Sequence, residues 1–311
     1  MIKLAIVIPC YNEEEVLPTT VKFLSKLMNE LVLEELIHPE STISFVDDGS
    51  KDKTWVLIEE ATRTEPMVHG IKLSRNRGHQ NALMAGLMTV EGDVVISIDA
   101  DLQDDLAAIR EMIIKHLDGA EIVYGIRNHR GTDTLFKRLS AEGFYRLLRM
   151  LGVDIVFNHA DYRLMSRAAI EALKRYDEVN LFLRGIIPQL GFKTANVFYE
   201  RAERFAGESK YPLRKMLSLA WDGLTSFSSI PLRWITIFGF IVSLLSFSAG
   251  GWALAVKLFF DGTVPGWAST VIPIYFLGGI QLLSLGIIGE YISKIYMETK
   301  RRPRFIIEKE I

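Results

Sequence analysis

The stretch VVISIDADLQDD, residues 94–105, places a run of β-branched residues directly before a cluster of acidic side chains. Short apolar runs bounded by polar turns are typical of buried strands. Asp99 and Asp101 are two residues apart at the predicted strand end, so a tight turn can aim both carboxylates at one ion, and Gln103 adds a neutral oxygen. A single strand-end aspartate often only caps the next helix. The Asp-x-Asp-x-Gln spacing favours a site for Mg²⁺ or Mn²⁺, which prefer hard oxygen ligands.

Other segments of the first 210 residues repeat this pattern of a short strand followed by a helix. The alternation predicts an α/β domain over residues 1–210, with a mostly parallel sheet covered on both faces. In such sheets, ligands bind at the carboxyl ends of the strands, which is where the acidic cluster lies. The other strand-like runs are 4–8, 43–46, 71–73 and 122–124, and the helical patterns are 16–28, 55–61, 81–88 and 109–117.

A second acidic pair, Asp47 and Asp48, ends another apolar run in FVDDGSKDKT, residues 45–54. A carboxylate at this position can accept hydrogen bonds from a nucleoside base or ribose. One member of the pair could equally cap the following helix. A dinucleotide-binding domain would need a glycine-rich loop after the first strand. That loop reads PCYNEE, residues 9–14, and contains no glycine, which disfavours an NAD enzyme.

Basic side chains follow several of the predicted strands and are candidates for binding phosphate groups. Arginine suits this role because its guanidinium makes bidentate contacts to phosphate oxygens. Any one of them could equally be a solvated surface charge, and the isolated His79 is interpreted as structural. The candidates are Arg75, Arg77, Arg127, Arg130, Lys137, Arg138, Arg163, Arg201, Arg204 and Lys210.

Composition narrows the range of partners. The 311 residues carry a formal net charge of −2, so no global excess of positive charge indicates nucleic acid. Cys10 is the only cysteine, which excludes an intrachain disulfide and a cysteine-based zinc site and fits a reducing compartment. The apolar run 4–9 is too short for a signal peptide and leads straight into an acidic stretch.

The last third of the chain has the composition of a membrane anchor. Residues 211–232 form an amphipathic pattern that predicts a helix lying in a membrane interface or packed on the soluble domain. Residues 235–256 and 267–289 contain no charged residue. Each is long enough to cross a hydrocarbon core of roughly 30 Å. We therefore predict two transmembrane helices, at about 235–258 and 267–290, within a membrane region spanning residues 233–297.

The distribution of lysine and arginine predicts the orientation of these helices. The connection 260–266 carries Asp261 and no basic residue, whereas basic residues lie before the first span and in the predicted tail, residues 298–311. By the positive-inside rule, the catalytic domain and both termini are expected on the cytoplasmic side of a cell (inner) membrane, with a multi-pass topology. The flanking basic residues are Arg214, Lys215, Arg233, Lys294, Lys300, Arg301, Arg302 and Arg304.

Taken together and in order, the motifs resemble the family-2 glycosyltransferases. Within this family, the chain is most similar to the polyprenyl-phosphate glycosyltransferases, which include the bactoprenol glucosyltransferases and, more distantly, dolichyl-phosphate mannose synthase. The similarity runs from residue 6 to about residue 304 and includes the tail FLGGIQLLSLGIIGEYISKIYMETKRRP. The motifs that carry it are IVIPCYNEE (6–14), VDDGSKD (46–52), LSRNRGHQNALMAGL (73–87), DADLQDD (99–105), DYRLMSR (161–167) and ERFAGESKY (203–211).

The resemblance implies a GT-A nucleotide-sugar-binding fold and an inverting reaction. It assigns Asp101, Asp161 and Arg127 to catalysis, with Asp161 either orienting the acceptor or acting as a base. The motif around Asp161 usually reads Gly-Asp-Phe-Arg, but Ala160 and Tyr162 replace the glycine and the phenylalanine here. The resemblance further assigns Pro9, Tyr11, Glu13, Asp48, Asp99 and Lys210 to the nucleotide-sugar; Asp99, Asp101 and Gln103 to the metal; and Arg127, Lys137, Arg138 and Arg163 to the acceptor phosphate.

The function expected from these features is transfer of a hexose, with glucose from UDP-glucose preferred, to undecaprenyl phosphate for modification of cell-envelope glycans. UDP-N-acetylglucosamine or another donor fits the motifs as well. A phosphate monoester has a second pKa of about 6, so the acceptor oxygen is already a nucleophile at neutral pH. A processive polysaccharide synthase should carry Gln-x-x-Arg-Trp, and the nearest match, residues 230–234, lacks the glutamine. A non-catalytic nucleotide-sugar-binding membrane module would not need the Asp-x-Asp-x-Gln motif intact.

The remaining partners expected are membrane lipid and a second copy of the chain. Gly278, Gly279, Gly286 and Gly289 allow close helix packing, either within one chain or between chains in a homo-oligomer.

Overall fold

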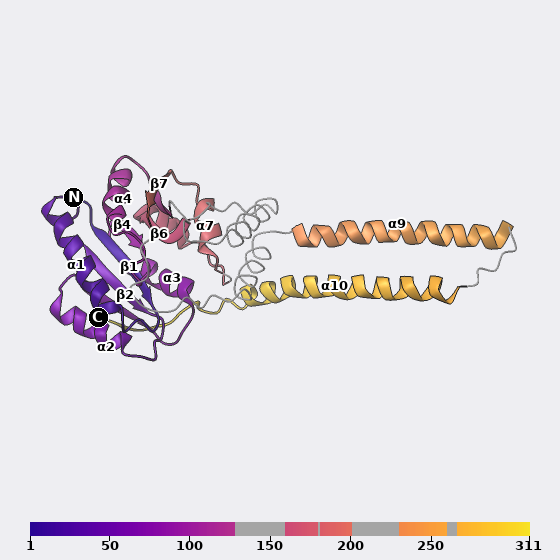
Figure 1. The fold of residues 1–311 in the computed structure, drawn as a ribbon, viewed down its shortest axis with the longest axis horizontal. Coiled ribbons are helices and arrows are strands. Elements are labelled where there is room, and N and C mark those ends of the chain that lie inside the picture. Colours follow the sequence, from indigo (N-terminus) through magenta and orange to yellow (C-terminus); the bar gives the residue numbers. More distant parts are fainter. Residues whose placement is uncertain (128–158, 180, 201–229, 260–265) are drawn as a thin grey trace.

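The computed structural model describes residues 1–127, 159–179, 181–200, 230–259 and 266–311. Several predicted features lie outside these residues, namely Lys137, Arg138, Lys210 and most of the amphipathic segment 211–232. The described residues form an α/β domain and two long helices that extend away from it (Figure 1).

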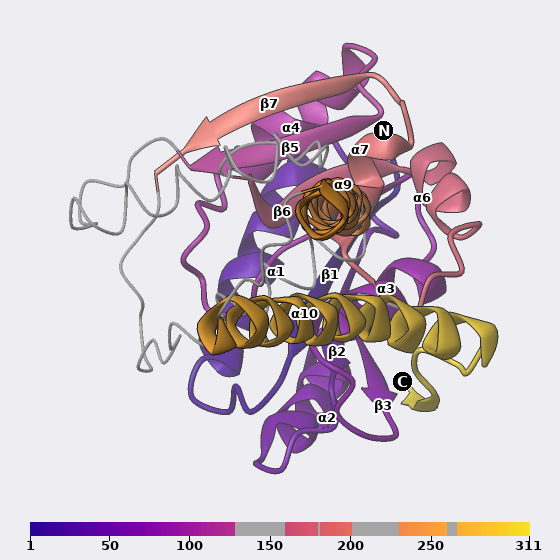
Figure 2. The same cartoon turned by 90° about the vertical axis from the view of Figure 1, so that its right-hand side faces the viewer.

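A single eight-stranded sheet organises the α/β domain. Its strand order is β7-β5-β6-β4-β1-β2-β3-β8, and Figure 2 shows it from β7 at one edge towards β3. The pairs β1–β2, β1–β4, β2–β3 and β5–β7 are parallel, whereas β6 is antiparallel to β4 and β5, and β8 is antiparallel to β3. The mostly parallel sheet expected from the sequence is therefore confirmed. The strands are β1 (Leu4–Cys10), β2 (Thr42–Asp47), β3 (Val68–Leu73), β4 (Val94–Ser97), β5 (Ile122–Arg127), β6 (His159–Ser166), β7 (Thr194–Tyr199) and β8 (Ile307–Glu310).

Helices cover both faces of the sheet because successive side chains of a central strand point to opposite sides. In β1, Leu4, Ile6 and Ile8 join one buried cluster, and Ala5 and Val7 join the other. The first cluster includes α1 (Leu17–Leu33), α2 (Thr54–Thr64) and α4 (Ala108–Leu117). The second includes α3 (His79–Thr89), α6 (Arg167–Leu173) and α7 (Leu183–Gln189).

Close packing of α3 on the sheet depends on Gly86. A Cβ at this position would lie 2.3 Å from Cγ1 of Val7, far inside van der Waals contact. Glycine therefore lets the α3 backbone approach β1 directly. The packing fixes the first residue of α3, His79, near the carboxyl ends of the parallel strands.

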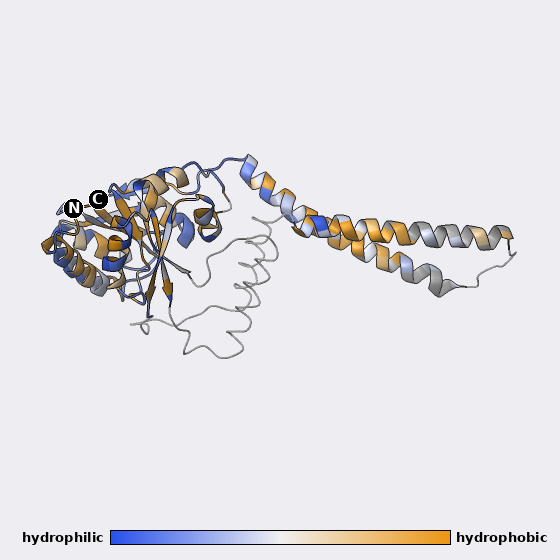
Figure 3. Ribbon diagram, turned by 90° about the horizontal axis from the view of Figure 1, so that it is seen from above, coloured by the Kyte–Doolittle hydropathy of each residue, from blue (hydrophilic) through white to orange (hydrophobic). Residues whose placement is uncertain are grey.

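The two long helices are α9 (Ile230–Phe259) and α10 (Trp267–Thr299), which lie side by side (Figure 1). Much of their length is hydrophobic, as Figure 3 shows, and large apolar side chains such as Phe240 and Leu282 are exposed. Within the described residues, one stretch, Phe276–Thr299, is long and apolar enough to cross a membrane, and Ile230–Val242 is a shorter apolar stretch. The two helices occur where two membrane spans were predicted, but length and hydropathy identify a candidate span in only one of them, α10, among the described residues.

The residues after α10 include the basic tail expected at 298–311. They return to the α/β domain, where β8 extends the sheet beside β3. Gly70 and Ile311 exchange two backbone hydrogen bonds of 2.9 Å. Lys309 pairs with Glu59 at 2.7 Å. This strand satisfies the backbone groups at the edge of β3. Its own side chains, IEKE, are mostly exposed, so the sequence carries no apolar run that would reveal it.

Candidate active site at the strand ends

The candidate site lies where β1, β2 and β4 end and β6 begins. Because β6 runs antiparallel to β4, with Ser97 opposite Arg163, the first residues of β6 meet the residues that follow β4. The Ser97 hydroxyl donates a hydrogen bond of 2.5 Å to the backbone oxygen of Asp161. This register brings Asp161 close to Asp99, at the carboxyl ends of the parallel strands.

The loops after β1 and β2 are joined by hydrogen bonds. The Asp48 N–H donates to the Cys10 carbonyl at 2.9 Å, and the Asn12 N–H donates to the Ser50 hydroxyl at 3.0 Å. The Glu13 N–H donates to the Thr54 hydroxyl at 2.8 Å. Residues predicted to line a nucleoside pocket therefore share one corner of the domain. Pro9 is buried, Tyr11 is 41% exposed and Glu13 is half-buried.

Asp47 and Asp48 are both buried and accept hydrogen bonds from main-chain N–H groups. Asp47 accepts from Ser50 at 3.1 Å, while the two oxygens of Asp48 accept from Arg77 at 2.6 Å and Gly78 at 2.8 Å. Burial raises the pKa of each carboxyl above its usual value. Both oxygens of Asp48 are thus engaged in holding the loop after β3, in addition to any contact with a nucleoside.

Gly49 allows that loop to pack against the acidic pair. Its φ is +67°, and a Cβ there would lie 2.6 Å from the backbone nitrogen of Asn76. Only glycine fits this close approach without moving the neighbouring backbone.

The residues after β4 form a tight turn. Leu102 adopts a φ of 53°, and the Gln103 N–H donates to Oδ1 of Asp101 at 3.3 Å. A left-handed leucine is uncommon and indicates a turn held by its surroundings. The Asp99 side chain remains 36% exposed. Its pKa is raised to about 6 by burial and by the charges of Asp161 and other nearby acids, against the opposing effect of His79.

The predicted metal ligands Asp99, Asp101 and Gln103 thus lie within one turn. In the parts of the chain that the structure describes, no group of three or more His, Cys, Asp or Glu side chains is arranged to hold a metal ion. Two carboxylates and an amide suit a cation that takes its remaining ligands from substrate phosphates and water, as Mg²⁺ commonly does. Burial and, to a smaller extent, the charges of nearby acids raise the pKa of Asp99, and a divalent cation would stabilise its ionised form. The residues therefore fit a divalent metal.

Asp161 lies at the centre of a cationic cluster formed by His79, Arg163 and Arg184. Its Oδ1 accepts from Nη2 of Arg163 at 2.5 Å, and its Oδ2 lies 3.3 Å from Nη2 of Arg184 and 3.5 Å from Nε2 of His79. Burial alone would raise the pKa of Asp161, but the hydrogen bond from His79 and the two arginines hold it well below its usual value. Asp161 is therefore an ionised group with little capacity to act as a general base.

Arg163 does not occupy the position expected of an acceptor ligand. Its side chain is 1% exposed and pairs with Asp161 beneath the surface of the site. A buried arginine needs such a partner, because an isolated buried charge is costly. In this arrangement Arg163 contacts Asp161, and its role in binding the acceptor phosphate remains a prediction.

Arg127, at the end of β5, belongs to a second cluster. Its Nη2 lies 3.2 Å from Oδ1 of Asp104, and its Nε donates to the Tyr199 hydroxyl at 3.2 Å. Tyr199 in turn donates to Asp104 at 2.5 Å. Burial opposes the charge of Arg127, but Asp104 raises the pKa of the guanidinium overall. Arg127 is thus tied to buried partners, while Lys137 and Arg138, predicted to act with it, lie outside the described residues.

Two members of the site were not recognised in the sequence. His79, interpreted there as structural, places Nε2 3.6 Å from Asp99 and 3.5 Å from Asp161. Burial alone would lower the pKa of His79, but Asp161 and Asp99 raise it overall. Arg184 was not singled out, although a signal existed. It is the one charged residue in the run LFLRGII, residues 181–187, and such a charge needs a specific partner.

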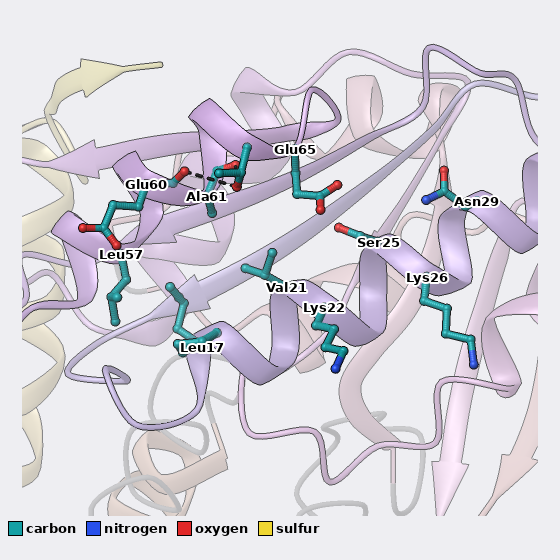
Figure 4. Close-up of a pocket in the computed structure, with 12 residues that line it drawn as sticks. Leu17, Val21, Lys22, Ser25, Lys26, Asn29, Leu57, Glu60, Ala61 and Glu65 are labelled. Carbon is teal, nitrogen blue, oxygen red and sulfur yellow. Dashed lines mark hydrogen bonds between the residues drawn. The ribbon is translucent and has the colours of Figure 1, made fainter.

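A separate groove of about 450 Å³ lies between α1 and α2 (Figure 4). It contains none of the predicted site residues, so the groove is distinct from the strand-end site. Its lining residues are Leu17, Pro18, Val21, Lys22, Ser25, Lys26, Asn29, Leu57, Glu60, Ala61, Thr64 and Glu65.

Comparison with known proteins adds an independent observation. The family model for glycosyl transferase family 2 matches residues 5–174. The chain is 53% identical over 310 residues to "Uncharacterized glycosyltransferase YkoT" of Bacillus subtilis (strain 168), covering 99% of this chain and 92% of that protein. It is 41% identical over 308 residues to "Prophage bactoprenol glucosyl transferase homolog" of Escherichia coli (strain K12), covering 99% of each. It is 42% identical over 309 residues to "Bactoprenol glucosyl transferase" of Shigella phage SfV, again covering 99% of each.

Proposed function

Because this chain belongs to glycosyl transferase family 2 and is therefore a glycosyltransferase, we propose that it transfers glucose from UDP-glucose to undecaprenyl phosphate with inversion. The product is a lipid-linked monophosphate sugar that donates glucose to cell-envelope glycans. One observation carries the proposal: identity of 41–42% to proteins called bactoprenol glucosyl transferases extends over 99% of the chain. It includes the two long helices, which a soluble sugar transferase would not require.

In this proposal α9 and α10 are two membrane spans, at about 235–258 and 267–290. The apolar exposed surface of both helices supports it, as does the span-like stretch Phe276–Thr299. The catalytic domain, residues 1–210, and both termini lie on the cytoplasmic side of the cell membrane. The absence of lysine and arginine from residues 260–266 supports this orientation.

The donor binds at the strand ends. Pro9, Tyr11 and Glu13 contact the nucleoside beside Asp48, and Lys210 contacts the diphosphate. Asp99, Asp101 and Gln103 hold Mg²⁺ or Mn²⁺, which when bound neutralises charge on the diphosphate leaving group. The acids that lie near Asp99, and that together with burial raise its pKa, support this part of the proposal.

The chemistry requires little from a general base. An oxygen of the acceptor phosphate attacks the anomeric carbon of glucose, and the bond from that carbon to the donor diphosphate breaks, its electron pair leaving with UDP. No proton needs to be removed, because a phosphate monoester is already anionic at neutral pH. The low pKa of Asp161 agrees with this scheme, in which Asp161 orients cations.

A donor panel tests the proposed function. Membranes containing the full chain are incubated with undecaprenyl phosphate and a series of labelled UDP- and GDP-sugars. We expect transfer of one glucose from UDP-glucose, and none to the neutral lipid alcohol. Transfer from UDP-N-acetylglucosamine alone would replace the sugar assignment. Polymer formation would indicate a processive synthase, and nucleotide-sugar binding without turnover would indicate a non-catalytic module.

Cysteine labelling tests the topology. We expect Thr263→Cys to react with an impermeant reagent from outside intact cells and Arg302→Cys to react only after permeabilisation. The native Cys10 is buried and gives a low background. The reverse pattern would place the active site on the opposite side.

A further inference from the structure

We propose that His79 and Arg184 form a subsite for the phosphate group of the acceptor, with Asp161 holding both side chains in position. The proposal rests on the function proposed above and assigns acceptor binding to residues outside the basic motifs.

The subsite follows from how charge is distributed around Asp161. This one carboxylate lies near two arginines and one histidine: Arg163 at 2.5 Å, Arg184 at 3.3 Å and His79 at 3.5 Å. Arg163 is buried and pairs with Asp161 from below, whereas the side chains of Arg184 and His79 are 34% and 43% exposed. The side chains of Arg184 and His79 are therefore accessible from the open side of the site, where their N–H groups can contact an anion.

The buried Arg163 contributes a further positive charge to the subsite. Nε and Nη1 of Arg163 have no hydrogen-bond partner among the described residues, although both atoms are inaccessible to solvent. A buried charge that is only partly paired strengthens the attraction of the site for an anion.

Arg184 lies on the side from which a lipid acceptor would arrive. Figure 1 shows α7 at the end of the α/β domain that faces α9 and α10. The segment before α7 is fixed to the end of α10, because both carboxylate oxygens of Glu298 accept from the Val179 N–H, at 3.0 and 2.9 Å. The Leu183 N–H donates to Oε1 of Gln80 at 2.9 Å, which ties α7 to α3. The segment that carries Arg184 is thus tied both to the end of α10 and to α3.

His79 connects this subsite to the donor. Its Nε2 lies between Asp161 and Asp99, and Asp99 belongs to the turn assigned to the donor diphosphate. An acceptor phosphate held by Arg184 and His79 would therefore sit beside the donor. Arg184, together with His79 when it is protonated, reduces the repulsion between acceptor and donor anions, and an acceptor oxygen can displace UDP without proton transfer.

Arg127 is less suited to the same task in this arrangement. Its guanidinium contacts both Asp104 and Tyr199, and the Asp104 side chain is 1% exposed. Moving Arg127 towards a phosphate would leave a buried carboxylate without its cation, which is costly. Arg184 contacts a carboxylate that keeps Arg163 as a partner, so Arg184 can bind a phosphate without leaving Asp161 unpaired.

Steady-state kinetics with the full-length membrane protein test the subsite. Undecaprenyl phosphate is varied at saturating UDP-glucose, UDP-glucose is varied at saturating acceptor, and UDP binding is measured separately. We expect Arg184→Ala to raise the acceptor KM about tenfold or more, since a charge-assisted contact to a phosphate is lost. The donor KM and the UDP Kd should change by less than about twofold, because the donor contacts remain. Arg184→Lys should restore part of the affinity, because an ammonium makes a weaker, non-bidentate contact.

A matched control and a second variant keep the test independent of folding defects. Arg175→Ala removes an exposed arginine that lies outside the site and should leave both KM values unchanged. His79→Gln should raise the acceptor KM several-fold, and together with Arg184→Lys it tests the subsite even if Arg184→Ala fails to fold.

Three results would overturn the subsite. A rise in donor KM or UDP Kd with an unchanged acceptor KM would assign the cations to the donor diphosphate. A fall in kcat alone, with both KM values unchanged, would limit Arg184 to orienting Asp161. An unchanged acceptor KM in all three site variants would remove the proposal, while wild-type transfer to undecaprenyl phosphate would still support the proposed function. If the wild-type protein transfers no sugar to any polyprenyl phosphate, the proposed function itself fails.

Discussion

Two pairs of aspartates lie at the ends of two strands of the same sheet, Asp47 with Asp48 and Asp99 with Asp101. Their side chains make different kinds of contact. Asp47 and Asp48, at the end of β2, are 0% and 2% exposed, and one oxygen of Asp47 and both oxygens of Asp48 accept main-chain N–H groups. Asp99, after β4, is 36% exposed in its side chain and faces His79 at 3.6 Å. A carboxylate whose oxygens are occupied by the backbone builds a loop, whereas one that retains open oxygens and cationic neighbours can bind a ligand.

The neighbouring strand explains the difference. β2 lies next to the parallel strand β3, so the loop after β3 runs past Asp48 and offers it the N–H groups of Arg77 and Gly78. β4 lies next to the antiparallel strand β6, whose beginning carries the Asp161 side chain instead of a loop of free N–H groups. The direction of the neighbouring strand thus determines whether the aspartates contact backbone N–H groups, as beside β3, or side chains, as beside β6.

The largest expected effect is a loss of activity, which should follow replacement of Asp101 in the second pair. Asp101→Asn should lower kcat by about 10²–10³-fold, because a charge aimed at the donor diphosphate is lost. Chelation by EDTA should do the same to the wild-type protein, with recovery on adding Mg²⁺ or Mn²⁺. Radiolabelled transfer in membranes measures the rate, and thermal unfolding in detergent should stay unchanged. Full activity in EDTA would remove the metal from the proposal.

The next effect separates them by stability. Asp48→Ala should lower the free energy of unfolding by about 2–3 kcal/mol, because two buried N–H groups lose their charged acceptor. Asp48→Asn keeps one acceptor oxygen and should lose less. Denaturant unfolding of the detergent-solubilised protein gives both values. A loss of stability from Asp101→Asn equal to that from Asp48→Ala would contradict the distinction between the two pairs.

A third effect concerns the pH dependence of stability. The folded-state pKa of Asp99, about 6, lies above its unfolded value, so the native state binds more protons between these two pKa values. Stability therefore falls as pH rises from about 4 to about 6, by about 1 kcal/mol after allowing for solvent screening of this partly exposed group. Asp99→Asn should lack this slope. Melting temperatures measured from pH 4 to 7.5, with and without Mg²⁺, test it, and Mg²⁺ should raise the wild-type value near neutral pH.

The smallest expected effect is a loss of stability. It tests whether burial, as well as hydrogen bonding to the backbone, determines how much free energy of unfolding is lost when an aspartate is replaced. Asp52 accepts from Thr54 at 3.0 Å and Glu14 at 3.2 Å but is only half-buried. Asp52→Ala should therefore cost about 0.5–1 kcal/mol, less than Asp48→Ala.

The contribution of Asp52 to stability should depend on pH in the opposite direction to that of Asp99. Burial opposes the shift, but hydrogen bonds from Thr54 and Glu14 lower the pKa of Asp52 overall. Its contribution is then present above the unfolded pKa and disappears as pH falls through the folded value. An Asp52→Ala cost that grows on acidification would refute this reading.

The strands at the centre of the sheet could be predicted because apolar runs reveal strands that are buried on both faces. Two strands could not be predicted in this way. The interior strand β6 carries Asp161 and Arg163, which are buried as a pair and break the apolar pattern. β8 is polar because it closes an exposed edge, and it pairs with a strand more than 200 residues earlier in the chain.

The sequence predicted those parts of the site whose residues lie close together in the chain. The turn around Asp99 and Asp101 is contained in a few residues, so its spacing is visible in the sequence. The contacts of Asp161 with His79 and Arg184 join three separate segments, and only the sheet register brings them together. The burial of Arg163 likewise depends on its neighbours, which sequence position does not reveal.

The position of β8 has a consequence for synthesis. A ribosome completes β1 to β7 and both long helices before residues 307–310 emerge, so the outer edge of β3 stays unpaired during that interval. Open strand edges promote association between nascent chains. The sheet can close only after α9 and α10 have been made, which links maturation of the enzyme to placement of its helices. A chain truncated after Thr299 would keep every predicted catalytic residue and still expose this edge.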